Sequence, residues 1–104
     1  MTERILPEGW VKYTTTPTPK APQGEYGAYW WLNAGNPLGT ANRLYPSLPT
    51  DLYLARGYEG QDTIVIPSRD LVVVHLGACT PPWGEGAWKP EEFVADILKA
   101  VKQQ

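Results

Sequence analysis

The sequence contains very little of the chemistry that catalytic and metal sites commonly use. Among its 104 residues there is one cysteine, one histidine and one methionine. A metal site needs three or four convergent ligands, and His75 and Cys79 are each the only residue of their kind. A single cysteine cannot form a disulfide within the chain, which favours a reducing, cytoplasmic location. We therefore expect no metal and no cofactor.

Charge of one sign and long apolar runs are also lacking. Nine basic and 11 acidic residues give a net charge of −2, and no basic stripe is present to attract nucleic acid. The longest apolar run is far shorter than a bilayer requires. Glu3 and Arg4 stand where the apolar core of a signal peptide would begin. The length predicts a single domain, 1–104, with neither a nucleic-acid nor a membrane partner.

Aromatic residues and prolines are abundant instead. The chain has five Trp, six Tyr and 11 Pro. Each large aromatic side chain can bury roughly 150–250 Å², so these residues should dominate a core or an interface. Disordered chains are poor in aromatics. The composition therefore indicates a folded unit with structured loops.

The pattern of apolar residues predicts an α+β fold. We expect an antiparallel sheet of three to four strands, with a C-terminal helix packed on one face. The strands are predicted at 26–33, 51–56, 62–67 and 71–77, and a tight turn joins the last two. Both faces of 71–77 are apolar, which is typical of a central strand covered on both sides.

Two helices are predicted at the ends of this sheet-forming region. Pro90 and the two acids after it suit a helix N-terminus, so the C-terminal helix should span 90–102. Its apolar residues recur at helical spacing and should cover the sheet: Phe93, Val94, Ile97, Leu98 and Val101. A shorter helix could begin at Pro7.

The residue types of a catalytic triad are present, but their positions in the sequence do not favour one. Ser47 or Ser68 would be the nucleophile, with His75 as base and Asp70 as its partner. Ser68 and Asp70 lie in the predicted turn, however, where such residues are common for conformational reasons. His75 within an apolar strand is interpreted as a structural histidine. Two carboxylates near a glycine turn are further candidates for an acid or base, Glu59 and Asp62.

Three stretches together resemble a known family. These are RILPEGWVKYTTTPTP, YGAYWWLN and LYLARGYEGQDTIVIPSRDLVVVHLG, within about Ile5 to Val101. They are similar to the C-terminal end of serine hydrolases of the β-lactamase and penicillin-binding-protein fold, in the esterase-like branch that includes 6-aminohexanoate-dimer hydrolase. In that family these pieces form the last strands of a central antiparallel sheet and the helix that packs on it.

The resemblance implies a site at a glycine turn. The family's third active-site element lines the cleft, and here it corresponds to Gly57, Tyr58, Glu59, Gly60 and Gln61. By resemblance, the backbone N–H of Tyr58 would be the second donor to the oxyanion of acyl transfer, an interaction worth about 2.7–4 kcal/mol. The alternative is that the two glycines merely shape the chain at the start of a strand.

The family's other catalytic motifs do not occur in this sequence. There is no Ser-x-x-Lys motif for the nucleophile and its base, and no Tyr-x-Asn motif. The resemblance thus predicts a C-terminal fragment or split part of a serine hydrolase, inactive alone, whose partner is a complementary N-terminal hydrolase part. The alternative is a free-standing binding or oligomerisation module. A small unrelated enzyme is the third interpretation.

Apolar surface left bare by the absent part predicts self-association. We expect a homo-oligomer, a dimer in the first instance, with Trp30 or Trp31 in the contact. Edge pairing through 26–33 or 51–56 is a second route to the same assembly.

Overall fold

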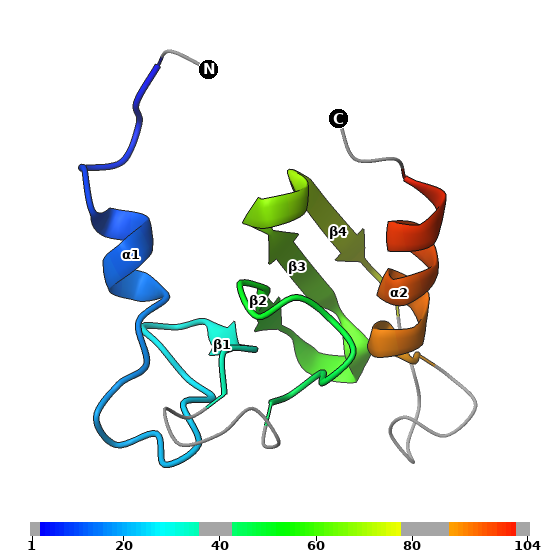
Figure 1. Cartoon of the computed structure of the whole chain (residues 1–104), viewed down its shortest axis with the longest axis horizontal. Helices are drawn as coiled ribbons and strands as arrows, with labels where there is room; N and C mark the ends of the chain where they lie inside the picture. Colours follow the sequence, from blue (N-terminus) through cyan, green and yellow to red (C-terminus); the bar gives the residue numbers. More distant parts are fainter. Residues whose placement is uncertain (1–2, 36–42, 78–87, 102–104) are drawn as a thin grey trace.

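A four-stranded antiparallel sheet with one helix on its face forms the centre of the molecule (Figure 1). The computed structural model describes residues 3–35, 43–77 and 88–101. The elements in chain order are helix α1 (Trp10–Thr14), strands β1 (Trp31–Leu32) and β2 (Tyr53–Arg56), 3-10 turn η1 (Tyr58–Gly60), strand β3 (Asp62–Ile66), 3-10 turn η2 (Pro67–Arg69), strand β4 (Leu71–His75) and helix α2 (Pro90–Ala100). The strands lie in the order β1-β2-β3-β4. The predicted α+β fold is confirmed.

The turn between β3 and β4 is built from residues that favour it. Pro67 fixes its own backbone angle at the start of η2. Asp70 then adopts a left-handed conformation, φ 50°, which aspartate tolerates better than most residues. The backbone N–H and hydroxyl of Ser68 both donate to the Asp51 carboxylate, at 2.6 and 2.9 Å. The predicted hairpin is confirmed.

The buried core lies on one face of the sheet, which we call the inner face. The inner face carries Leu54, Ile64, Ile66 and Val73, all buried. Two segments cover it: the loop 43–52, through Tyr45, Leu48 and Leu52, and helix α2, through the fully buried Val94. Loop and helix therefore share the role that was expected of the helix alone.

One buried amide holds the loop 43–52 against the sheet. Asn33 is fully buried just after β1. Its Nδ2 group donates to the carbonyl oxygens of Tyr45, Leu48 and Pro49, at 3.0, 3.2 and 2.8 Å. Its Oδ1 accepts the backbone N–H of Tyr45 at 2.6 Å. An irregular loop can be buried only if its backbone groups are paired, and this side chain provides the pairing.

The aromatic stretch 26–33 forms much less strand than predicted. Only Trp31 and Leu32 pair with β2, because the chain turns back on itself within the stretch. Tyr26 bridges to Trp31, and the N–H of Gly27 donates to the carbonyl of Trp30 at 2.9 Å. Tyr29 at the tip has φ 71°. The strand preference of aromatic side chains is overridden here by a local turn.

Strand β4 lies at the edge of the sheet, so the prediction of a central strand covered on both sides was wrong. Its Val72 and Val74 side chains are 59% and 56% exposed. They point to the opposite side of the sheet from the core, which we call the outer face, together with Val65 and Tyr53. Edge pairing through 51–56 was also wrong, since β2 lies between β1 and β3.

The helices differ modestly from their predicted ranges. Helix α2 ends at Ala100. Residue 102, the last of the predicted range 90–102, lies outside the described residues. Within the predicted stripe, Phe93 and Val101 are 48% and 45% exposed. Helix α1 begins at Trp10, three residues after Pro7, and Figure 1 shows it on the β1 side of the sheet, with α2 on the β4 side. Of the helices described, none has the length and apolarity to cross a membrane.

Helix α2 should depend mainly on one side chain. Val94→Ala removes two buried methyl groups and leaves a cavity, so it should lower the free energy of unfolding by about 2–3 kcal/mol. Val101→Ala is the matched control, because the same atoms are removed at an exposed end of the helix. Urea unfolding followed by circular dichroism measures both variants. Equal losses in the two would contradict the placement of α2.

Candidate functional site

The five residues from Gly57 to Gln61 form a closed turn between β2 and β3. Gly57 is extended, Tyr58–Gly60 make one turn of 3-10 helix, and Gln61 returns to extended backbone. The N–H of Gly57 donates to the carbonyl of Gln61 at 2.6 Å, which closes the turn at its base. The side-chain amide of Gln61 donates to the carbonyl of Tyr58 at 3.3 Å. The five residues predicted as a site element are thus one continuous structural unit.

The two glycines of this turn differ in whether their backbone conformation requires a glycine. Gly60 has φ 82°, where a side chain costs about 1–2 kcal/mol. Gly57 has φ −109°, which any residue adopts, and a Cβ there would meet only Gln61, at 3.4 and 3.5 Å. Gly60 is therefore required by the fold, whereas Gly57 is not. A missing side chain at an exposed position that the fold does not constrain lets another molecule approach the backbone closely.

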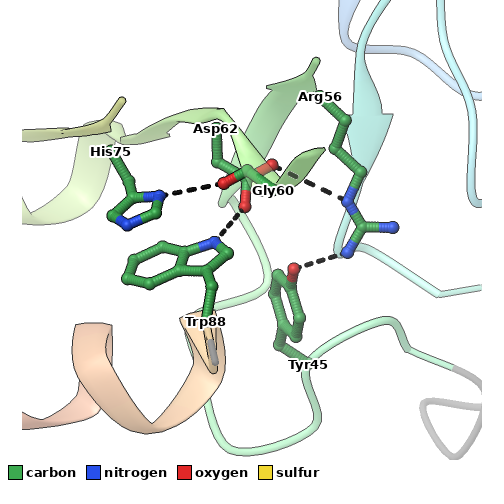
Figure 2. Close-up of polar contacts among 6 residues, drawn as sticks. All are labelled: Tyr45, Arg56, Gly60, Asp62, His75 and Trp88. Carbon is green, nitrogen blue, oxygen red and sulfur yellow. Dashed lines mark hydrogen bonds and ion pairs between the residues drawn. The ribbon is translucent and has the colours of Figure 1, made fainter. Parts of the chain in front are cut away.

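A pair of opposite charges closes the turn from the strands. Arg56 and Asp62 are direct cross-strand partners, one before and one after the turn. Arg56 Nε lies 4.0 Å from Asp62 Oδ1. The Asp62 carboxylate is 6% exposed, and its other oxygen accepts the indole N–H of Trp88 at 2.6 Å. Figure 2 shows Arg56 and Trp88 both directed at the Asp62 carboxylate.

His75 fixes the far side of the turn. Its Nδ1 lies 2.9 Å from the carbonyl oxygen of Gly60 (Figure 2). A carbonyl only accepts hydrogen bonds, so we assign the hydrogen of this contact to Nδ1. The imidazole ring stacks on Trp88, with ring centroids 3.8 Å apart and planes within 3°. His75 is therefore a positioning group for the turn, in agreement with its structural interpretation.

Tyr45 connects the turn to the loop 43–52. Arg56 Nη2 donates to the Tyr45 hydroxyl at 2.6 Å. The guanidinium carbon also lies 5.8 Å from the ring centres of Tyr45 and Trp31, within cation–π range. Burial raises the pKa of Tyr45 above its ordinary value of 10.0, although the neighbouring Arg56 charge and hydrogen bond act in the opposite direction. The neutral hydroxyl is thus the stable form in the folded chain.

The residues proposed for a triad are not brought together. Ser68 donates to Asp51 and Ser47 donates to Glu91, so each hydroxyl is bonded to a carboxylate and not to the imidazole. His75 is the last residue of β4, whereas Asp70 precedes its first. At about 3.3 Å per strand residue, the two lie roughly 15 Å apart along the chain. The described residues contain no cluster of three or more metal-ligating side chains.

Sequence reasoning identified part of this site. The turn, Asp62 and His75 were all named as candidates. Arg56, Tyr45 and Trp88 were not singled out. Opposite charges immediately flanking a glycine turn were the available signal for Arg56 and Asp62. No local pattern indicates Tyr45 or Trp88, since each reaches the site from a distant segment of the chain.

Comparison with protein-family models, with curated proteins and with solved structures found no significant match. The site is therefore interpreted from its own geometry. It surrounds a backbone turn with a connected set of polar and aromatic side chains, and it offers a peptide backbone and a half-exposed guanidinium to a ligand. Among the described residues, no serine is paired with a base.

Removing the buried charge should loosen the turn. Asp62→Asn keeps the size of the side chain but takes the anion away from Arg56 and weakens the bond to Trp88, so the free energy of unfolding should fall by about 1–3 kcal/mol. Asp96→Asn on the exposed side of α2 is the control and should stay within about 0.5 kcal/mol of the original chain. The indole N–H proton of Trp88, assigned with Trp88→Phe, should shift upfield in Asp62→Asn. An unmoved resonance would contradict the contact.

Tyrosine ionisation should destabilise the fold in alkali. In the folded chain, burial raises the pKa of Tyr45, and burial followed by the Asp51 charge raises that of Tyr53. In the unfolded chain both ionise at the ordinary value of 10.0. The stability that they contribute is therefore complete below pH 10 and is lost as the pH rises through the folded-state values. Tyr45→Phe should make the free energy of unfolding fall less steeply above pH 10, measured by urea unfolding. An unchanged slope would contradict the burial of this hydroxyl.

Proposed function

We propose that this chain is the C-terminal part of a serine hydrolase of the β-lactamase-like fold, inactive without a nucleophile-bearing N-terminal part. One observation carries the proposal: the turn 57–61 is held rigid from several sides, yet Gly57 leaves its backbone open in a way that the fold does not require. Preorganised backbone groups are what an acyl-transfer site needs at its cleft. The family resemblance of the same five residues supports the same role.

The surface of the chain supports a large partner. Exposed apolar side chains gather on the N-terminal segment and α1, where Ile5, Trp10 and Tyr13 are 83%, 46% and 68% exposed. Monomeric proteins rarely leave large contiguous apolar patches in water. A second hydrolase part that covers this segment and helix accounts for their exposure.

The hydrolytic step needs a serine from outside the described chain. Ser47 and Ser68 each donate to a carboxylate, Glu91 and Asp51. Neither has a lysine or histidine base in hydrogen-bonding reach, so neither is activated for attack on a carbonyl. The substrate class is that of the intact family, esters and amides. We also propose a cytoplasmic location, which the single cysteine supports.

The alternative function is a free-standing binding or oligomerisation module that reuses the hydrolase sheet. The observation that favours it is that the described residues leave the edge and the outer face of β4 uncovered. Under this alternative the rigid turn has no catalytic partner. The two functions predict different results when the chain is mixed with a nucleophile-bearing part: the hydrolase part should restore turnover, and the binding module should not.

Reconstitution tests the proposal. The purified chain alone should not hydrolyse activated esters, β-lactams or linear amides above the buffer rate. It should restore turnover to a member of the family that is produced without its own C-terminal strands and helix. Gly57→Ala should leave the stability of the chain unchanged but lower the restored rate by roughly 10- to 100-fold, since the added methyl group displaces the substrate. Replacing the partner's nucleophilic serine by alanine should abolish the rate.

Two results would contradict the proposal. Turnover by the chain alone that disappears in Ser47→Ala or Ser68→Ala would show an independent nucleophile. Failure to bind or activate the truncated relative, with the chain folded, would favour the binding module.

A further inference from the structure

The sheet has two edges, and the described residues protect only one of them. At the first edge, β1 is two residues long, and a short strand offers little backbone for pairing. At the other edge, β4 has five residues; within the described part of the chain it pairs with β3 alone. Strand β4 contains no lysine, acidic residue or proline, the residues that commonly protect an edge. Its free side is a template for another strand.

The sequence of β4 suits pairing with its own copy. In Leu71-Val72-Val73-Val74-His75, the central Val73 has an identical residue on each side, Val72 and Val74. If two copies pair antiparallel with Val73 opposite Val73, each Val72 lies opposite a Val74. These two side chains are 59% and 56% exposed on the outer face. Branched apolar residues in direct cross-strand contact stabilise a sheet, so this register covers the most exposed part of the strand.

The flanking residues are compatible with the same register. Continuing it beyond the strand sets Asp70 of one copy opposite Leu76 of the other, so no like charges meet. A lasting interface covers about 800 Å² on each partner, more than five paired residues provide. Leu76 is 74% exposed beside the strand end, and Phe93 is 48% exposed where it contacts Trp88 near His75. Both extend the apolar contact.

We infer that a second copy of this chain binds along β4, antiparallel and centred on Val73, to form a two-fold dimer with a continuous sheet. The inference is independent of the hydrolase proposal. It also places the contact away from Trp30 and Trp31, whose rings pack against Tyr53 and Tyr26 of the same chain, at 4.8 and 5.0 Å.

Light scattering and sedimentation on the intact chain test the dimer. At high micromolar concentration the original chain should have twice the 11.6 kDa mass. The double variant Val72→Lys/Val74→Lys sets lysines opposite lysines and should raise the dissociation constant at least about tenfold. Val11→Lys is the matched control, since this valine is 50% exposed but lies on α1; the control should dimerise like the original chain.

A charge exchange tests the register. Val72→Glu/Val74→Glu should be monomeric alone, as the lysine variant is, and an equimolar mixture of the two should form a heterodimer. General apolar association cannot produce this rescue, because each variant has lost the same apolar surface. The wild-type chain gives a reading that does not depend on the variants folding: amide hydrogen exchange of residues 71–75 should slow as protein concentration rises.

Several outcomes overturn the inference. They are a monomer at high micromolar concentration, exchange in 71–75 that does not depend on concentration, or a dimer that the lysine variant leaves intact. A chain that stays monomeric but loses its binding to a truncated hydrolase in the lysine variant would show that β4 receives a strand of the hydrolase part. In that case the dimer fails while the proposed function stands.

Discussion

The buried side chain of Asn33 is the interaction on which the rest of the structure depends. It pairs four backbone groups of a loop that has no regular structure of its own. Without it, the backbone N–H of Tyr45 would lose the partner that holds Tyr45 over the sheet, and the carbonyls of Tyr45, Leu48 and Pro49 would each lose one of two donors. Tyr45 in turn bonds Arg56, which pairs with Asp62 beside the glycine turn. The conformation of the candidate site thus depends on an amide just after β1, in a different segment of the chain from the turn.

The sequence predicted those parts of the fold that local physics determines. The β3–β4 hairpin and helix α2 carry their own signals: Pro67 and Asp70 in the turn, and Pro90 with apolar residues at helical spacing. The strand at 26–33 was overestimated because a turn at Gly27–Trp30 prevailed over aromatic strand preference. The position of β4 was misjudged because apolar residues on both faces indicate only that a strand can be covered on both sides. The pattern does not indicate which segment or molecule provides the cover.

The site was predictable only where it is contiguous in sequence. Gly57 to Gln61 form one turn, so a motif could identify them, and the charges on either side follow from strand pairing. Trp88 reaches Asp62 across 26 positions of sequence, and Tyr45 reaches Arg56 across 11. Contacts between distant segments depend on how the loop and helix pack, which no spacing rule encodes. The buried role of Asn33 is hidden for the same reason, because an isolated asparagine after a strand is ordinarily read as a turn residue.

The order of the strands has a consequence for how such a chain can arise and persist. Each described strand pairs only with strands next to it in sequence. A meander of this kind loses no inner strand when a coding region is divided ahead of it, and a strand from another polypeptide can join it beside β4 without any rethreading of the backbone. Such a meander therefore retains its own core whichever segment precedes it. The edge beside β4 stays available for a strand of another polypeptide.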